Sequence, residues 1–91
     1  MERIEALRKR IDEIDEQILY SLKQRVEACR TIGAVKREQM MPIKDPPREN
    51  VLCRRISEKA TELGLNSAEV ERIYREIVAM CTHVQEYNVE P

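Results

Sequence analysis

The sequence contains no Phe and no Trp, only two glycines, and three cysteines that never form a C-x-x-C pair. Disulfide frameworks and structural zinc sites need even or clustered sets of cysteines, so we expect neither of them and no bound metal. No stretch approaches the ~20 successive apolar residues of a membrane span, and the charged N-terminal stretch does not resemble a secretion signal. These absences predict a soluble cytoplasmic protein with free thiols.

Acidic and basic residues are nearly balanced, with 17 and 16 of each and a net charge of −1. Nucleic-acid binding requires a basic excess on one face, so this balance argues against a nucleic acid as the main partner. A chain of 91 residues has room for a single domain, which we assign to residues 1–91. Its apolar residues are mostly aliphatic, and the thin core that they can form favours additional packing against a partner.

Near the N-terminus, apolar residues recur with alternating spacings of three and four, at Ile4, Leu7, Ile11, Ile14 and Ile18. This heptad-like spacing, with no proline before Pro42, predicts one helix from about residue 3 to 39. Such a helix would span about 55 Å, whereas a compact chain of this length has a radius of gyration of roughly 12 Å. The aliphatic seam would lie in water unless a second copy covered it, so the length predicts an intertwined homodimer.

Two shorter helices are predicted after the proline-containing segment. Asp45 is a suitable N-cap, with Pro46 in the first helical position, and Gly64 is a candidate C-cap for the helix between them. Asn66 and Glu69 have the spacing of a capping box in front of a third helix with one apolar face. We see no strand pattern, and the expected fold is therefore all-α with three helices.

Two long cationic residues interrupt the apolar seam of the first helix. Continuing the heptad places Arg25 where an aliphatic residue is expected, with Lys36 about 16 Å further along the same face. Between them is room for a small anion. Gln85 is similarly a polar residue on the apolar face of the third helix. Each also has an ordinary structural explanation: Arg25 could extend to solvent, Lys36 could stabilise a helix C-terminus and Gln85 could mark an exposed end.

The segment between the first two helices carries four charged residues among its prolines: Lys44, Asp45, Arg48 and Glu49. If the second helix begins at Asp45, then Arg48 and Glu49 lie in its first turn, beside unpaired backbone N–H groups. Lys36, near the end of the first helix, returns toward this turn across a short loop. A cation, a carboxylate and free amides would then converge on one pocket, which suits a small dianion that also bears a hydroxyl group.

In order and spacing, these features resemble the all-helical chorismate mutases over essentially the whole chain. The resemblance is carried by LRKRIDEID (7–15), Arg25, GAVK ending at Lys36, PIKDPPRE (42–49) and the segment from Cys81 to Gln85. Members of that family convert chorismate to prephenate as intertwined dimers and use no cofactor. The resemblance therefore implies the same fold, a homodimer and a cofactor-free reaction for this chain.

The resemblance also implies roles for individual residues, with Lys36, Gln85 and Arg25 as the catalytic group. Arg25 would bind one substrate carboxylate, and Arg8 of the other protomer would bind the second. Lys36 would bridge a carboxylate and the ether oxygen, and Gln85 would donate to that oxygen from the opposite side. Independently of the resemblance, Arg8 precedes Arg25 by about 25 Å of helix and roughly 100° of rotation, so the two cannot share a pocket within one chain.

The remaining implied contacts come from the second helix and from Cys81. Glu49 and the backbone of Asp45 would hold the ring hydroxyl, and Arg48 would line the site. Cys81 departs from the pattern, because relatives often have Ser or Thr at this position and a thiol donates only weakly. No base lies one helical turn from Cys81, so a catalytic thiol is not expected.

The reaction that the resemblance implies accounts for these residue types. A Claisen rearrangement forms no covalent adduct with the protein, which has only to orient a flexible dianion and stabilise charge on the breaking ether oxygen. Two other functions remain open from the residues alone. An isochorismate–pyruvate lyase shares the fold and much of the pocket, whereas a non-enzymatic helical dimerisation module would leave Arg25 and Lys36 replaceable by leucine.

Overall fold

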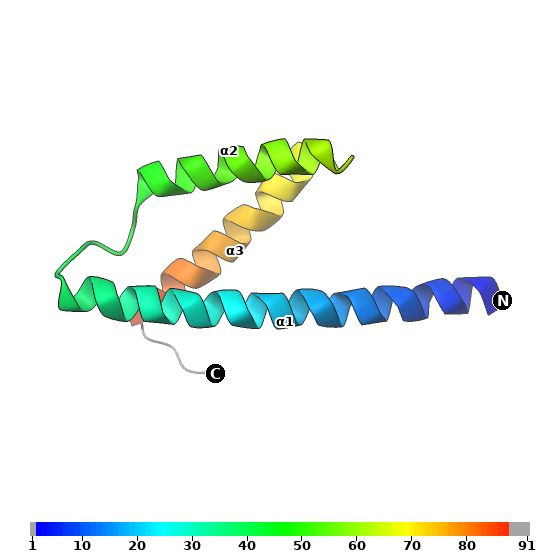
Figure 1. The fold of residues 1–91 in the computed structure, drawn as a ribbon, viewed down its shortest axis with the longest axis horizontal. Coiled ribbons are helices and arrows are strands. Elements are labelled where there is room, and N and C mark those ends of the chain that lie inside the picture. Colours follow the sequence, from blue (N-terminus) through cyan, green and yellow to red (C-terminus); the bar gives the residue numbers. More distant parts are fainter. Residues whose placement is uncertain (1, 88–91) are drawn as a thin grey trace.

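The computed structural model describes residues 2–87, which form three helices and contain no strand. Helix α1 spans Glu2–Glu38, α2 spans Pro46–Glu62 and α3 spans Ser67–Tyr87 (Figure 1). The predicted all-α fold with one very long N-terminal helix is confirmed, and the bounds of that helix differ from the prediction by one residue at each end. None of these helices is both long enough and apolar enough to cross a lipid bilayer.

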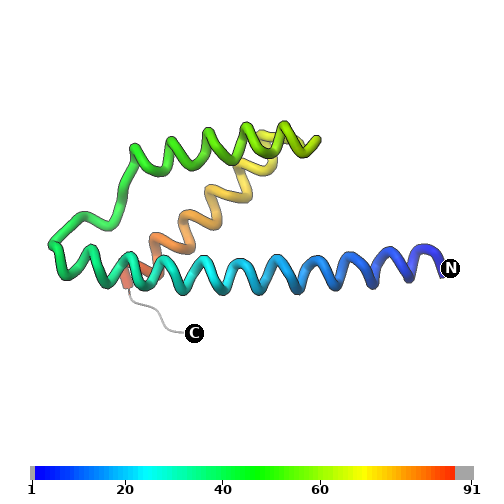
Figure 2. The backbone as a smooth tube through the Cα atoms, in the orientation of Figure 1, coloured from blue at the N-terminus to red at the C-terminus, as the bar shows by residue number. Residues whose placement is uncertain are grey.

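The first helix gives the chain an elongated shape. The principal extents are 57 × 30 × 14 Å and the radius of gyration is 16.3 Å, compared with roughly 12 Å for a compact chain of this length. In the backbone trace, α2 and α3 fold back over the C-terminal part of α1, while its N-terminal part runs on without a neighbour (Figure 2). The helix therefore projects beyond the rest of its own chain, as its length predicted.

Two left-handed residues end the first two helices. Gly64 has φ +75°, and the N–H groups of Gly64 and Leu65 donate to the carbonyls of Thr61 and Ala60. The C-cap itself is Leu63, so Gly64 closes the end of α2 from one residue beyond the cap rather than as the cap that was predicted. At the end of α1 the same pair of bonds forms around Met40, whose φ is 55°. A residue with a side chain is strained in this conformation, and no feature of the sequence marked Met40 for it.

Side-chain caps begin the second and third helices. Asp45 Oδ1 accepts a hydrogen bond of 3.1 Å from the N–H of Arg48, and Pro46 occupies the first helical position. Asn66 Oδ1 accepts one of 3.0 Å from the N–H of Glu69. Both predicted N-caps are confirmed, and the first of them fixes where the charged turn of α2 starts.

Helix α3 joins the other two, because it packs against both α1 and α2, whereas α1 and α2 make no direct backbone contact within residues 2–87. The buried apolar core is small and consists of Cys29, Leu52, Cys53, Ala60, Cys81 and Val84. The aliphatic seam of α1 remains uncovered in the single chain, with exposed fractions of 45% for Ile4, 55% for Leu7 and 55% for Ile11. Ile14 and Ile18 continue this exposed seam at 42% and 53%.

Candidate active site

A cavity of about 300 Å³ lies between the C-terminal halves of α1 and α3 and the first turn of α2. Its polar lining includes every predicted site residue except Arg8, namely Arg25, Lys36, Asp45, Arg48, Glu49, Cys81 and Gln85. Aliphatic side chains, among them Ile32, Ile43 and Leu52, complete the wall. We call this space the Arg25–Lys36 cavity. Residues that are far apart in sequence thus meet around one space of a size suited to a small molecule.

Arg25 is held at the cavity by sulfur rather than by a carboxylate. Its Nη1 donates to the Sγ of Cys81 over 2.8 Å and lies 3.9 Å from the Sγ of Cys29, one turn further along α1. Sulfur is a weak acceptor, whereas a carboxylate forms a strong, charge-assisted pair with a guanidinium group. A ligand carboxylate can therefore compete readily for the half-buried Arg25 side chain.

Lys36 approaches the cavity from the end of α1 and ties the following loop to that helix. Its Nζ donates to the backbone carbonyl of Ile43 over 2.7 Å. The reversal of the chain at Met40 brings this carbonyl within reach, because the loop turns back over the last turn of α1. An ammonium group has three donors, so Lys36 can keep this bond and still donate to a ligand.

Gln85 faces the cavity from α3, is 9% exposed and packs against Gly33 of α1. Its buried Oε1 accepts no hydrogen bond from the described part of the chain. A buried amide oxygen that lacks a hydrogen-bond partner is costly. Rotation of the amide by 180° would exchange its oxygen and nitrogen, so that the two N–H donors would occupy the position of Oε1. In either orientation, Gln85 retains hydrogen-bonding capacity for a molecule in the cavity.

The first turn of α2 supplies the opposite wall. Asp45 caps the helix, and the side chains of Arg48 and Glu49 line the same cavity. Helix N-termini present unpaired N–H groups and a positive dipole, which favour an anion or a polar oxygen nearby. The four charges of the 40–51 segment are nevertheless divided, because Lys44 does not line the Arg25–Lys36 cavity.

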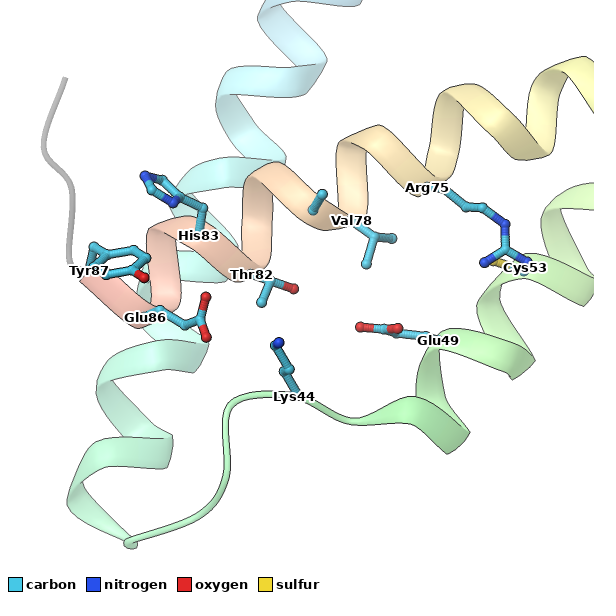
Figure 3. Close-up of a pocket in the computed structure, with 10 residues that line it drawn as sticks. Lys44, Glu49, Cys53, Arg75, Val78, Thr82, His83, Glu86 and Tyr87 are labelled. Atoms are coloured by element: carbon cyan, nitrogen blue, oxygen red, sulfur yellow. The ribbon is translucent and has the colours of Figure 1, made fainter.

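Lys44 instead lines a second cavity of about 490 Å³ on another face of α3, which we call the His83 cavity (Figure 3). Lys44 and Glu49 line it from the loop and α2, and Thr82 and Glu86 point toward Lys44 from α3, while the His83 ring lies at its edge and points away from Lys44. Glu49 lines both cavities. The charge cluster that the sequence presented as one group is therefore distributed around α3, and only the Glu49 carboxylate is shared by the two cavities.

Burial and neighbouring charges act on the Cys29 thiol. Its pKa is raised from 9.0 to about 11, first by burial and then by the interaction with Cys81, while the positive charges of Arg25 and Lys36 oppose the increase. The Cys29 thiol is consequently protonated at neutral pH. It contributes neutral lining to the Arg25–Lys36 cavity rather than a negative charge.

Several residues that line this cavity were not among the predicted site residues, including Cys29, Ile43 and Thr82. Cys29 follows Arg25 by four residues, so helical periodicity placed it on the same face and could have identified it. The carbonyl of Ile43 could not be identified from the sequence. Every residue has a backbone carbonyl, and the position of this one depends on how the loop reverses. Arg8 lies in the projecting part of α1 and does not line the cavity of its own chain.

The protein is all-α, and its three helices surround the Arg25–Lys36 cavity. The cavity is lined by cations and by an amide that can form further hydrogen bonds, which suits a small anionic ligand. The family model for chorismate mutase type II matches residues 7–86, and the chain belongs to that family. The resemblance inferred from its motifs is thereby confirmed. No solved structure gives a significant match to the chain.

Several curated relatives are similar to the chain. A bifunctional chorismate mutase/prephenate dehydratase of Aquifex aeolicus is 36% identical over 88 residues, which cover 93% of this chain and 24% of the relative. A 3-dehydroquinate dehydratase of Pyrobaculum aerophilum is 34% identical over 88% of this chain and 23% of the relative. A chorismate mutase of Methanocaldococcus jannaschii is 34% identical over 68% of this chain and 63% of the relative. The chain thus spans about a quarter of the first two relatives and nearly two thirds of the third.

Proposed function

We propose that this chain is a chorismate mutase, which rearranges chorismate to prephenate without a cofactor. Family membership supports the reaction, and one structural observation carries the assignment. Arg25, Lys36 and Arg48 face the same cavity of about 300 Å³ together with the buried Gln85 amide, whose oxygen has no partner in the described chain. Separated cations, and an amide that presents its N–H donors once it is rotated by 180°, match a dianion whose ether oxygen gains negative charge during reaction.

In this proposal, Arg25 exchanges its weak sulfur acceptor for a substrate carboxylate. The guanidinium group fixes the orientation of that carboxylate through two parallel hydrogen bonds. Glu49 accepts from the ring hydroxyl beside the capped turn at Asp45, and Arg48 adds positive charge to the wall. Holding a flexible substrate in its reactive conformer accounts for a large part of catalysis when no covalent chemistry is involved.

Lys36 and Gln85 act on the bond that breaks. They approach the cavity from α1 and α3, so an ether oxygen between them would accept a donor from each side. The bond from Lys36 to the Ile43 carbonyl holds the ammonium group in place before substrate arrives. Donors that are already in position need not reorganise as charge develops, and each is typically worth about 3 kcal/mol in the transition state.

The active form in this proposal is an intertwined homodimer with Arg8 donated across the interface. Support comes from the seam of α1, whose five aliphatic residues are between 42% and 55% exposed in the single chain. An apolar groove of about 360 Å³ between α1 and α3, lined by Ile14, Ile18 and Ile77, continues this uncovered surface toward Arg25. An antiparallel second copy of α1 would cover the seam and bring its own Arg8 toward the cavity.

We expect the protein to act in the cytoplasm. Cys29, Cys53 and Cys81 are free thiols, and a reducing compartment keeps thiols in this state.

Incubation with chorismate tests the proposed reaction. We expect loss of chorismate absorbance with formation of prephenate. Release of pyruvate in a parallel incubation with isochorismate, without formation of prephenate from chorismate, would identify the lyase and contradict the proposal. Lys36→Ala should lower kcat/KM by about two to three orders of magnitude, because one preorganised donor is removed. Lys44→Ala is the matched control, since that lysine lines the His83 cavity. Equal losses in the two variants would contradict the assignment of Lys36.

A further inference from the structure

Two buried thiols from different helices meet at one guanidinium nitrogen. Cys29 of α1 is 8% exposed and Cys81 of α3 is 3% exposed. Arg25 Nη1 lies 3.9 Å from the first sulfur and 2.8 Å from the second, and both residues line the Arg25–Lys36 cavity. The third cysteine, Cys53, is equally buried but lies on α2 and lines the His83 cavity instead. The chain therefore contains one thiol pair and one separate thiol.

The proposed reaction leaves this pair without a chemical role. A rearrangement needs no nucleophile, and the weak acceptor strength of sulfur makes it a poor permanent partner for Arg25. The two sulfurs nevertheless border the space where a carboxylate is proposed to bind, so a small reagent that enters the cavity reaches both.

We propose that Cys29 and Cys81 form a dithiol modification site, which small oxidants of the peroxide class convert to a disulfide between α1 and α3. A disulfide draws its two sulfurs to about 2 Å, and it replaces the Cys81 thiol to which Arg25 Nη1 donates by a neutral disulfide sulfur. Formation of the link therefore alters the contact that positions the guanidinium group on this wall of the cavity. In a reducing compartment such a link is transient and marks oxidative conditions.

The chemistry balances with one peroxide per disulfide. Cys81 reacts first, because its sulfur lies nearer to the Arg25 guanidinium group, at 2.8 Å against 3.9 Å for Cys29, and a neighbouring cation makes a cysteine more reactive. Its sulfur takes one oxygen from hydrogen peroxide to give a sulfenic acid, and one water is released. The Cys29 sulfur then attacks the Cys81 sulfur, the S–S bond forms, the S–O bond breaks, and the hydroxyl leaves as a second water with the Cys29 proton. Two thiols are oxidised by two electrons, and the peroxide is reduced to two waters.

The consequence for activity rests on the proposed function. The link alters the sulfur contact that positions Arg25 and fixes the spacing of α1 and α3 beside Gln85. Activity should fall in proportion to the fraction of chain that carries the link, and reduction with dithiothreitol should restore it. The modified protein should remain folded, because both cysteines already belong to the packed core.

Peptide mapping tests the link without reference to activity. Trypsin places each cysteine in its own peptide: residues 26–30, 49–54 and 76–91. After peroxide treatment and alkylation of the remaining thiols, we expect the first and third peptides to be joined and the second to be alkylated. A link that involves peptide 49–54, a link between two copies of the same peptide, or no link at all would overturn the proposal.

Variants then separate this site from general oxidative damage. Cys53→Ser should form the same link and lose activity as the wild type does. Cys81→Ser should form no link and, relative to its own untreated activity, should resist peroxide. Cys29→Ser should stop at a sulfenic acid on peptide 76–91, which dimedone traps. Inactivation of Cys81→Ser to the same extent as the wild type would contradict the proposal. If the reduced wild type were inactive, the proposed function would be refuted, and the peptide map alone would then test whether the disulfide forms.

Discussion

Gly33 on α1 touches Gln85 on α3 so closely that a Cβ at Gly33 would lie 3.1 Å from both the Cα and the Cγ of Gln85. Because one of these atoms belongs to the backbone, rotation of the Gln85 side chain cannot relieve the contact. Gly33→Ala should therefore displace α3 by a few tenths of an ångström. We expect kcat to fall by about tenfold with a smaller change in KM, since even a 1 Å misplacement can cost about a hundredfold. Steady-state kinetics measures both constants.

Two control variants show whether Gly33→Ala acts by moving Gln85 or by a general effect on helix α1. Ala34→Gly changes the exposed neighbouring position and should lower stability, because glycine disfavours helix by about 1 kcal/mol, while leaving kcat intact. In a Gln85→Ala background, Gly33→Ala should have no further effect on kcat. Additive losses in the double variant would show that Gly33 does not act through Gln85.

Gln85→Glu tests whether this side chain donates to the substrate. A carboxyl group donates only while it is protonated, and burial raises the pKa of a carboxyl group. The protonated fraction grows as pH falls, so the activity of this variant should increase toward acid pH, whereas the wild type should not share this shift. Gln85→Ala supplies the baseline, with low activity and no acid shift. An identical pH–rate profile for the Glu variant and the wild type would argue against a donor role.

The protonated state of Cys29 has a direct chemical readout. Because its pKa is raised to about 11, the thiolate fraction should increase about tenfold per pH unit from neutral pH and level off above pH 11. The rate of alkylation by iodoacetamide, followed on peptide 26–30, should show the same rise. Since the raised pKa favours the protonated folded state, the associated stability is present below pH 9 and declines as pH rises through 11. Rapid alkylation of peptide 26–30 at pH 7 in the folded protein would contradict this.

Mixing two inactive variants tests the donation of Arg8 across the dimer. Arg8→Ala and Arg25→Ala should each be nearly inactive alone. In a mixed dimer, one site would receive an intact Arg25 from one chain and an intact Arg8 from the other, while its second site would carry both lesions. Random exchange makes about half of the dimers mixed, so roughly a quarter of wild-type activity should return. No recovery, with exchange confirmed by mass spectrometry, would reject the shared site.

The helix ends were largely predictable, because they depend on residues that are close together in sequence. Asp45 and Asn66 act as caps and Gly64 closes the end of α2 through their own backbone and side-chain atoms, so their roles were evident without knowledge of tertiary structure. Arg25 was recognisable because a charge stood in an aliphatic seam. The left-handed turn at Met40 was not, since its strain is offset by the two hydrogen bonds that close the helix end.

The detailed composition of the site was harder to predict, because it depends on how helices cross. Lys44 and Glu49 are near neighbours in sequence, yet only Glu49 reaches the Arg25–Lys36 cavity. The contact between Cys29 and Cys81 requires α1 and α3 to cross at one particular level. Sequence periodicity gives the face on which a residue lies but not the height at which a second helix meets it.

The exposed seam of α1 also affects how the number of active sites depends on the concentration of the chain. Under the proposed dimer, each catalytic site needs two chains, so the number of sites follows the square of chain concentration once the protein is dilute relative to its dissociation constant. Halving synthesis in that range would leave about a quarter of the sites, whereas at high concentration it would leave half. Five aliphatic side chains on one helix would thereby make flux through the reaction sensitive to gene dosage, with no regulatory ligand involved.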